Sequence, residues 1–266
     1  MIVHILLKYS TVEHISRCFH ISILTLTLMI LLEYYTWNEK WVKTLKKPGN
    51  WELYLDAWKT NLIHYFIIGP LAYFLASVVV LEMGAPLSPW ICAPGVFLTQ
   101  SIGYALTHHW MHKPKNYARI HKYHHGFSEL TFVRPVTANA TTLEEFVLAY
   151  VVPITIGTFI WRPTMDVIFY IVATISVCNL FIHTDCDSID MSWAPDFLVT
   201  NLKHFHHHEK NVKRHYSAPI VDLDYILGIV DSKTYQKKDD DVRTCPASGQ
   251  KGDACPVGFK SSTTSE

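Results

Sequence analysis

The sequence predicts an all-α, multi-span membrane protein whose helical cap carries a histidine-ligated metal site. Of its 266 residues, 49% are hydrophobic and only 17% are charged. Several apolar runs are about as long as the ~20 residues that a helix needs to cross a bilayer. Twelve of the sixteen histidines fall between His108 and His125 or between His183 and His215. This combination is typical of membrane helices with a metal site at one end.

Composition argues against several other classes of protein. The formal net charge is zero and no basic stripe is interleaved with aromatic residues, so we do not expect nucleic-acid binding. The six cysteines show no CxxC spacing, which argues against a zinc finger or a disulfide framework. Neither a GxGxxG nor a GxSxG motif is present, so a bound dinucleotide and a hydrolase of the GxSxG type are not expected.

The first apolar run, from about Ser16 to Thr36, is long enough to span a hydrocarbon core. A cleaved signal peptide is the alternative, but no small-residue cleavage site follows the run, and we expect a retained anchor. Further candidate spans are Asn61 to Leu81, about Pro89 to Thr107, Leu143 to Trp161, and Asp166 to His183. The last two runs fit either two spans or a half-inserted hairpin, since Arg162-Pro163-Thr164 is a turn sequence in both cases.

The sides of the membrane follow from basic residues between the first two spans, which are Lys40, Lys43, Lys46, Lys47 and Lys59. The positive-inside rule places that segment in the cytosol. Each later span crosses to the opposite side, so every histidine-rich stretch returns to the cytosolic side. The result is the same if the last two apolar runs only dip into the membrane. We therefore expect a single cytosolic face on which all clustered histidines can meet.

Three histidine groups have helical spacing: HHWMH (His108–His112), HKYHH (His121–His125) and HFHHH (His204–His208). Members three or four residues apart project from one helix face. In the first group, His108 with His112 is favoured, but His109 with His112 is also possible. In the third group, His206 should point away from the other three histidines.

The ends of these helices also follow from the sequence. Pro114 should end the helix of the first group and Gly126 should cap the second. Asp196 is the expected N-cap of a third helix that runs to about Asn211.

We expect these three groups to bind metal and not to be ordinary core or surface histidines. A lone histidine, such as His4, His14, His20 or His64, is usually an ordinary core or surface residue. Many imidazoles that converge at one membrane face would be costly to bury without hydrogen bonds or a metal. A low-complexity metal-storage tract would show simple repetition, not face-matched groups far apart in the chain.

The pattern His-x3-His, His-x2-His-His and His-x2-His-His resembles the fatty acid hydroxylase superfamily over roughly Pro89 to Asp231. The resemblance implies nine metal ligands, of which His183 matches the family's further histidine: His108, His112, His121, His124, His125, His183, His204, His207 and His208. Asn179 replaces a histidine of some members and is a candidate either to hydrogen-bond a metal ligand or to ligate weakly itself. His109 and His215 are candidates of the same kind.

The resemblance implies a dimetal centre with two non-haem iron ions, which uses O2 to hydroxylate or desaturate a lipid, either a sterol or a fatty acyl chain. Electrons would come from a separate cytochrome b5 or NAD(P)H reductase. The protein would lie in the endoplasmic reticulum membrane with its C-terminus cytosolic. Residues 1–88 would be the membrane anchor, 89–231 the catalytic domain and 232–266 a disordered polar tail.

Two alternatives stay open at this point. A metal-binding membrane protein without catalytic activity should carry its ligands near the bilayer midplane, whereas these histidines lie at the span ends. An inactive relative with a regulatory role is the other. We further expect Asp185, Asp187 and Glu209 to orient the imidazoles as hydrogen-bond acceptors.

Overall fold

The computed structural model of the protein describes residues 12–82, 86–127, 133–185, 188–210 and 215–229. The predicted disordered tail, 232–266, lies outside them. Within the described residues the regular secondary structure is helical, apart from one isolated bridge between Leu198 and Val221. The prediction of an all-α fold is confirmed.

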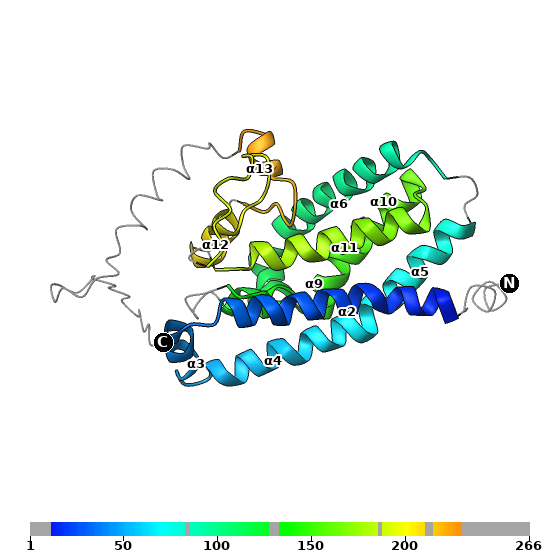
Figure 1. Cartoon of the computed structure of the whole chain (residues 1–266). Helices are drawn as coiled ribbons and strands as arrows, with labels where there is room; N and C mark the ends of the chain where they lie inside the picture. Colours follow the sequence, from blue (N-terminus) through cyan, green and yellow to red (C-terminus); the bar gives the residue numbers. More distant parts are fainter. Residues whose placement is uncertain (1–11, 83–85, 128–132, 186–187, 211–214, 230–266) are drawn as a thin grey trace. The chain divides into compact units, whose positions relative to one another are not determined.

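Five long helical segments run side by side (Figure 1). Two of them contain a π-helical turn between two α-helices. In chain order the segments are α2 (Val12–Tyr35); α4 (Asn50–Ile63), η1 (His64–Ile68) and α5 (Gly69–Glu82); α6 (Pro89–Met111); α9 (Leu143–Phe146), η5 (Val147–Val151) and α10 (Val152–Trp161); and α11 (Met165–Ile182).

Polar side chains cap the starts of two of these segments. The Thr142 hydroxyl accepts from the Glu145 N–H at the start of α9, and the Thr164 hydroxyl accepts from the Val167 N–H at the start of α11. Such caps satisfy backbone donors that have no partner inside the helix. Between α10 and α11, Arg162 adopts a left-handed conformation with φ 43° and reverses the chain, as the turn sequence predicts.

Four helical segments are long and apolar enough to cross a membrane: Ile15–Tyr35, Asn50–Val78, Leu143–Trp161 and Met165–Ile182. This is typical of an integral membrane protein. The second span was predicted to begin at Asn61, but its helix begins at Asn50. The half-polar segment after Gly49 contains no helix-breaking residue, so the helix runs from there into the apolar run without interruption. The predicted span Pro89–Thr107 forms a helix, α6, but is not one of the four, and its Gln100 and Ser101 are buried polar side chains.

Small residues bring α6 close to α10. A Cβ added at Gly103 would lie 2.6 Å from the Cβ of Pro153, and one added at Gly95 would overlap the ring of Trp161. Gly157 faces Val96 and Thr99 in the same way. Close approach through glycines is a common way of packing membrane helices.

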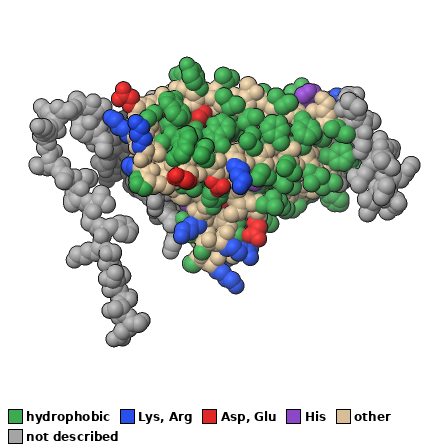
Figure 2. Space-filling view, turned by 90° about the horizontal axis from the view of Figure 1, so that it is seen from below, with side chains coloured by type: hydrophobic (Ala, Val, Ile, Leu, Met, Phe, Trp, Pro, Cys, Tyr) green, Lys and Arg blue, Asp and Glu red, His purple; other side chains and the backbone are tan. Residues whose placement is uncertain are grey.

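The outer surface of the bundle is strongly apolar. Figure 2 shows one side of the bundle, and hydrophobic side chains cover most of the described surface there. Large side chains exposed on α2, α4, η1 and α5 include Leu24, Leu31, Leu62, Ile67 and Leu71. Apolar contact of this extent fits lipid, because a water-exposed monomer rarely shows such large apolar patches.

One end of the bundle gathers the polar elements. The lysine-bearing helix α3 (Glu39–Leu45) and the histidine-rich helix α12 (Asn201–Lys210) both lie at this end (Figure 1). The histidine end of α6 and the C-terminal end of α11 point the same way. The histidine stretches therefore share an end with the lysine-bearing segment, as counting the spans predicts.

Candidate metal centre

The first two histidine groups occupy consecutive short elements. His108 is in the last turn of α6 and His112 is its C-cap. Pro114 then starts the short helix α7 (Pro114–Asn116), so the helix ends before this proline, as expected. His121 closes the π-helical η2 (Tyr117–His121), and α8 (Lys122–His125) carries the next two histidines.

The start of the third helix was predicted wrongly. Helix α12 begins at Asn201, not after Asp196. Leu198 forms a β-bridge with Val221, and the Val199 N–H donates to the Ile220 carbonyl, so this segment is extended. The Thr200 hydroxyl accepts from the Lys203 N–H at 3.3 Å and supplies the cap.

The nine predicted ligands form two buried or nearly buried groups. The first consists of His108, His112, His121, His125 and His207, and the second of His124, His183, His204 and His208. Within each group, one nitrogen atom of every residue lies within 4.8 Å of those of the others, which is close enough for a shared metal ion. Both α8 and α12 give neighbouring histidines to different groups. The groups therefore adjoin, and the rings of His125 and His208 stack with centroids 4.6 Å apart.

The other candidate residues lie outside both groups. His109 is exposed and stacks on the ring of Tyr216 at 4.9 Å, so the structure pairs His108, not His109, with His112. His206 is buried but belongs to neither group, which agrees with the helical-face argument. His215 also belongs to neither group and has a left-handed backbone conformation with φ 62°.

Asn179 contributes through its backbone, not through its amide. Its side-chain oxygen accepts from the Tyr150 hydroxyl at 3.1 Å, and its side-chain nitrogen donates to Asn139 at 3.1 Å. The Asn179 backbone carbonyl lies 2.7 Å from Nδ1 of His183. In this structure the amide is hydrogen-bonded to residues outside the two groups, and the backbone carbonyl is what contacts a candidate ligand.

The partners of the Nδ1 atoms decide where the protons are. Nδ1 of His108 lies 2.9 Å from the Tyr216 backbone carbonyl, which can only accept. Nδ1 of His121 lies 2.8 Å from Glu145 Oε1, and an ionised carboxylate also only accepts. In both rings the proton is then on Nδ1 and the lone pair on Nε2. With Glu145 ionised, these two Nε2 lone pairs face each other at 2.9 Å, an arrangement that a bound cation would stabilise.

The spacing of the nitrogen atoms fits a metal ion. With metal–nitrogen bonds of about 2.1 Å, two ligands at a right angle are about 3.0 Å apart. In the first group, His112 Nε2 and His207 Nε2 are 3.0 Å apart, and His108 Nε2 and His207 Nε2 are 3.1 Å apart. In the second group, His204 Nε2 is 2.9 Å from His183 Nε2 and 3.0 Å from His208 Nε2. An all-imidazole set of this kind suits zinc, copper, iron or nickel.

Burial keeps the imidazoles in the form that binds metal. Desolvation lowers the pKa of His183 to about 3 and that of the less buried His112 to about 4. Desolvation also lowers the pKa of His108 and His204, and neighbouring histidines lower it further. Each ring is therefore neutral near pH 7, with a lone pair free for coordination.

Glu145 is the acidic partner of a candidate ligand and was not predicted from the sequence. Its bond to His121 gives the carboxylate–histidine arrangement that orients metal ligands in many proteins. An acidic residue at the edge of an apolar span was the available signal. The predicted partner Asp185 instead accepts from the Ser188 hydroxyl at 2.6 Å. Asp187 and the side chain of Glu209 lie outside the described part of the chain.

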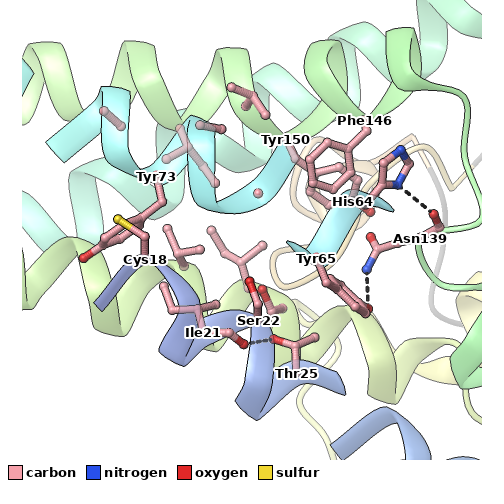
Figure 3. Close-up of a pocket in the computed structure, with 18 of the residues that line it drawn as sticks. Cys18, Ile21, Ser22, Thr25, His64, Tyr65, Tyr73, Asn139, Phe146 and Tyr150 are labelled. Carbon is pink, nitrogen blue, oxygen red and sulfur yellow. Dashed lines mark hydrogen bonds between the residues drawn. The ribbon is translucent and has the colours of Figure 1, made fainter. Parts of the chain in front are cut away.

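A cavity lies inside the bundle (Figure 3). It is bounded by α2, η1, α5, η5 and α11 and has a volume of about 100 Å³. Asn179, which lines the cavity, bonds through its backbone to His183, so the cavity ends close to the second histidine group.

Comparison with known proteins agrees with the geometry of this site. A family model described as fatty acid hydroxylase matches residues 93–229, which is more than half of the chain. No match was found among curated proteins or among solved structures. The matched segment contains both histidine groups and the acidic partner of His121. The chain belongs to the fatty acid hydroxylase family.

Proposed function

We propose that this protein is a membrane oxygenase that hydroxylates or desaturates a lipid, using two iron ions and O2. The observation that carries the proposal is the pair of adjoining all-histidine groups in a chain of this family. When bound, the irons supply the activation of O2 and the abstraction of hydrogen from an unactivated C–H bond. Acid–base side chains alone cannot perform that step, so a metal cofactor is needed.

The protein's own residues would hold and orient the ions. The His108 and His121 rings are fixed by the Tyr216 carbonyl and by Glu145, and the His183 ring by the Asn179 carbonyl. Because these partners accept from Nδ1, they direct each Nε2 lone pair inward and strengthen it as a ligand. The adjoining bundle would exclude bulk water and deliver the lipid through the apolar cavity.

The proposed redox partner and membrane orientation rest on the sequence. The chain has no dinucleotide fingerprint, which favours electrons from a separate cytochrome b5 or NAD(P)H reductase. The lysines of α3 and the segments around it favour a cytosolic histidine end. An endoplasmic reticulum location follows from the family resemblance and is part of the proposal.

The test is metal content together with turnover. Protein purified in detergent from iron-supplied cells should carry close to two iron equivalents and should oxidise a lipid extract only with O2 and an external reductase. A matched control is the His121→Ala variant, which removes one ligand of the first group. Turnover that continued without O2 would refute the oxygenase, and iron binding without any lipid oxidation would favour a non-catalytic metal protein.

A further inference from the structure

We infer that Lys203 and Asp222 are positioning residues for one of the two metal positions, the one held by the five-histidine group. They would act through residues 215–227, a segment that we call the strap, which lies against this group. The inference rests on the metal centre of the proposed function, but it is tested by metal affinity and not by turnover.

The strap contacts the five-histidine group through Tyr216. The Tyr216 backbone carbonyl accepts from Nδ1 of His108 at 2.9 Å and so fixes the orientation of that ring. The centroid of the Tyr216 ring lies 5.1 Å from that of His112 and 5.7 Å from that of His207. His112 is the one member of the group that is not fully buried. A shift of the strap would therefore disturb three ligands of this group at once.

Among the described residues, the strap makes no hydrogen bond to the four-histidine group. His204 lies near the strap residues Ser217 and Asp222. Its Nε2 faces the histidines of its own group, and its Nδ1 has no hydrogen-bond partner within the described chain. The ring of His183 is held by a backbone carbonyl of α11, not by the strap. A displaced strap should therefore loosen the five-histidine group more than the four-histidine group.

The buried Lys203 side chain holds the strap to the segment that precedes α12. Its ammonium group donates to the backbone carbonyls of Asp196 at 2.6 Å and Leu198 at 3.0 Å. It also pairs with the Asp222 carboxylate of the strap at 3.0 Å. An ammonium group has three N–H donors, so each of them has an acceptor here. The side chains of Lys203 and Asp222 are only 8% and 3% exposed, so removal of either partner would leave a buried charge unpaired.

Hydrogen bonds inside the strap connect Asp222 with Tyr216. The Asp222 side chain caps α13 (Leu223–Ile226) by accepting an N–H of its first turn. The Ser217 hydroxyl accepts from the first N–H of α13 at 2.9 Å and donates to the Asp224 carboxylate of the same helix at 2.8 Å. Ser217 directly follows Tyr216 in the chain. A shift of Asp222 would therefore move α13, Ser217 and the carbonyl that holds the first metal ligand.

The geometry of α12 explains why Lys203 serves the five-histidine group. Lys203 and His207 are four residues apart and lie on the same side of the helix. His207 belongs to the five-histidine group and its ring contacts that of Tyr216. His204 is the sequence neighbour of Lys203, but the helix turns by about 100° between them. The group that Lys203 supports is therefore not the group of its neighbour in sequence.

The experiment measures the affinity of each metal position separately. Purified protein in detergent is loaded with two equivalents of zinc and titrated with a chelator. The His112→Ala and His183→Ala variants show which release step belongs to which group. Lys203→Met keeps the apolar stem but removes the charge; it should weaken the five-histidine group about 10-fold and the four-histidine group less than about 3-fold. Lys122→Met is the matched control and should change neither step, because Lys122 is exposed although it follows the ligand His121.

Two further variants separate an effect on the strap from damage to α12. Ser217→Ala loosens the strap without changing α12 and should weaken the same group, because two N–H groups of the strap lose their acceptor. The double variant Lys203→Met/Asp222→Asn removes the buried charge that the single variant leaves unpaired. It should hold metal in the five-histidine group at least about 3-fold more tightly than Lys203→Met alone. Circular dichroism checks that each variant keeps its helices.

Two results would overturn the inference. In the first, folded Lys203→Met and Ser217→Ala both hold metal in the five-histidine group as tightly as the parent. In the second, Lys203→Met weakens the four-histidine group equally or more, which would mean that Lys203 only stabilises the start of α12. Failure of the proposed function looks different: zinc affinities would follow the predicted pattern, but the iron-loaded protein would oxidise no lipid. A parent protein that bound no zinc would refute the metal centre itself and the inference with it.

Discussion

Replacing Glu145 tests whether a buried carboxylate tunes the metal site. Its Oε1 lies 2.8 Å from Nδ1 of His121, and the side chains of His121 and Glu145 are 0% and 3% exposed. Glu145→Ala leaves a buried N–H without an acceptor and frees the ring to turn or to change tautomer. Glu145→Gln keeps an acceptor oxygen but removes the negative charge that strengthens His121 as a ligand.

Two independent considerations give the size of the effect. Losing such a partner typically lowers metal affinity about 10-fold to 100-fold, which corresponds to about 1.4 to 2.8 kcal/mol. An unpaired buried donor costs about 1 to 3 kcal/mol, which agrees with that range. We expect Glu145→Ala near the upper end and Glu145→Gln near 10-fold. Both losses should appear in the five-histidine group, which contains His121.

The assay is chelator competition with purified protein in detergent, with metal content measured at each chelator concentration. Glu144→Gln is the matched control, because Glu144 is the neighbouring acid but its side chain is 54% exposed and pairs with Arg119 at 3.4 Å. Circular dichroism checks that each variant keeps its helices. The reasoning would be refuted if Glu145→Ala held metal as tightly as the parent, or if Glu144→Gln weakened binding equally.

Three further predictions concern the histidine string, the helix packing and the topology. His207→Ala should lose metal from the five-histidine group and abolish turnover, whereas His206→Ala should retain most of both; equal loss in the two folded variants would contradict the helical-face assignment. Gly103→Ala should destabilise the α6–α10 packing by about 1 to 3 kcal/mol, measured by thermal unfolding in detergent, since its Cβ would lie 2.6 Å from the proline of α10. Tags inserted after Ser128 and at Glu266 should both be cytosolic in a protease-protection assay, and tags on opposite sides would exclude a single metal face.

Local periodicity was enough to predict much of this protein. Spacings of three and four residues placed His204, His207 and His208 on one face and His206 off it, because a helix turns by a fixed angle per residue. Lengths of apolar runs predicted the long helices, and the alternating directions of five long segments brought the histidine stretches to one end, although α6 is not among the four candidate spans. Helix boundaries were less certain. The start of α12 depends on a β-bridge to Val221, far along the chain, and no local signal reports it.

Only the tertiary structure divided the nine histidines into groups of five and four. His124 and His125 are neighbours in sequence, yet they belong to different groups, because successive helical residues point about 100° apart. The same is true of His207 and His208 in α12. The pairing of Glu145 with His121 and of Asn179 with His183 also depends on contacts between elements. Sequence therefore determines which side of a helix a side chain occupies, whereas packing between distant segments decides which partner it meets there.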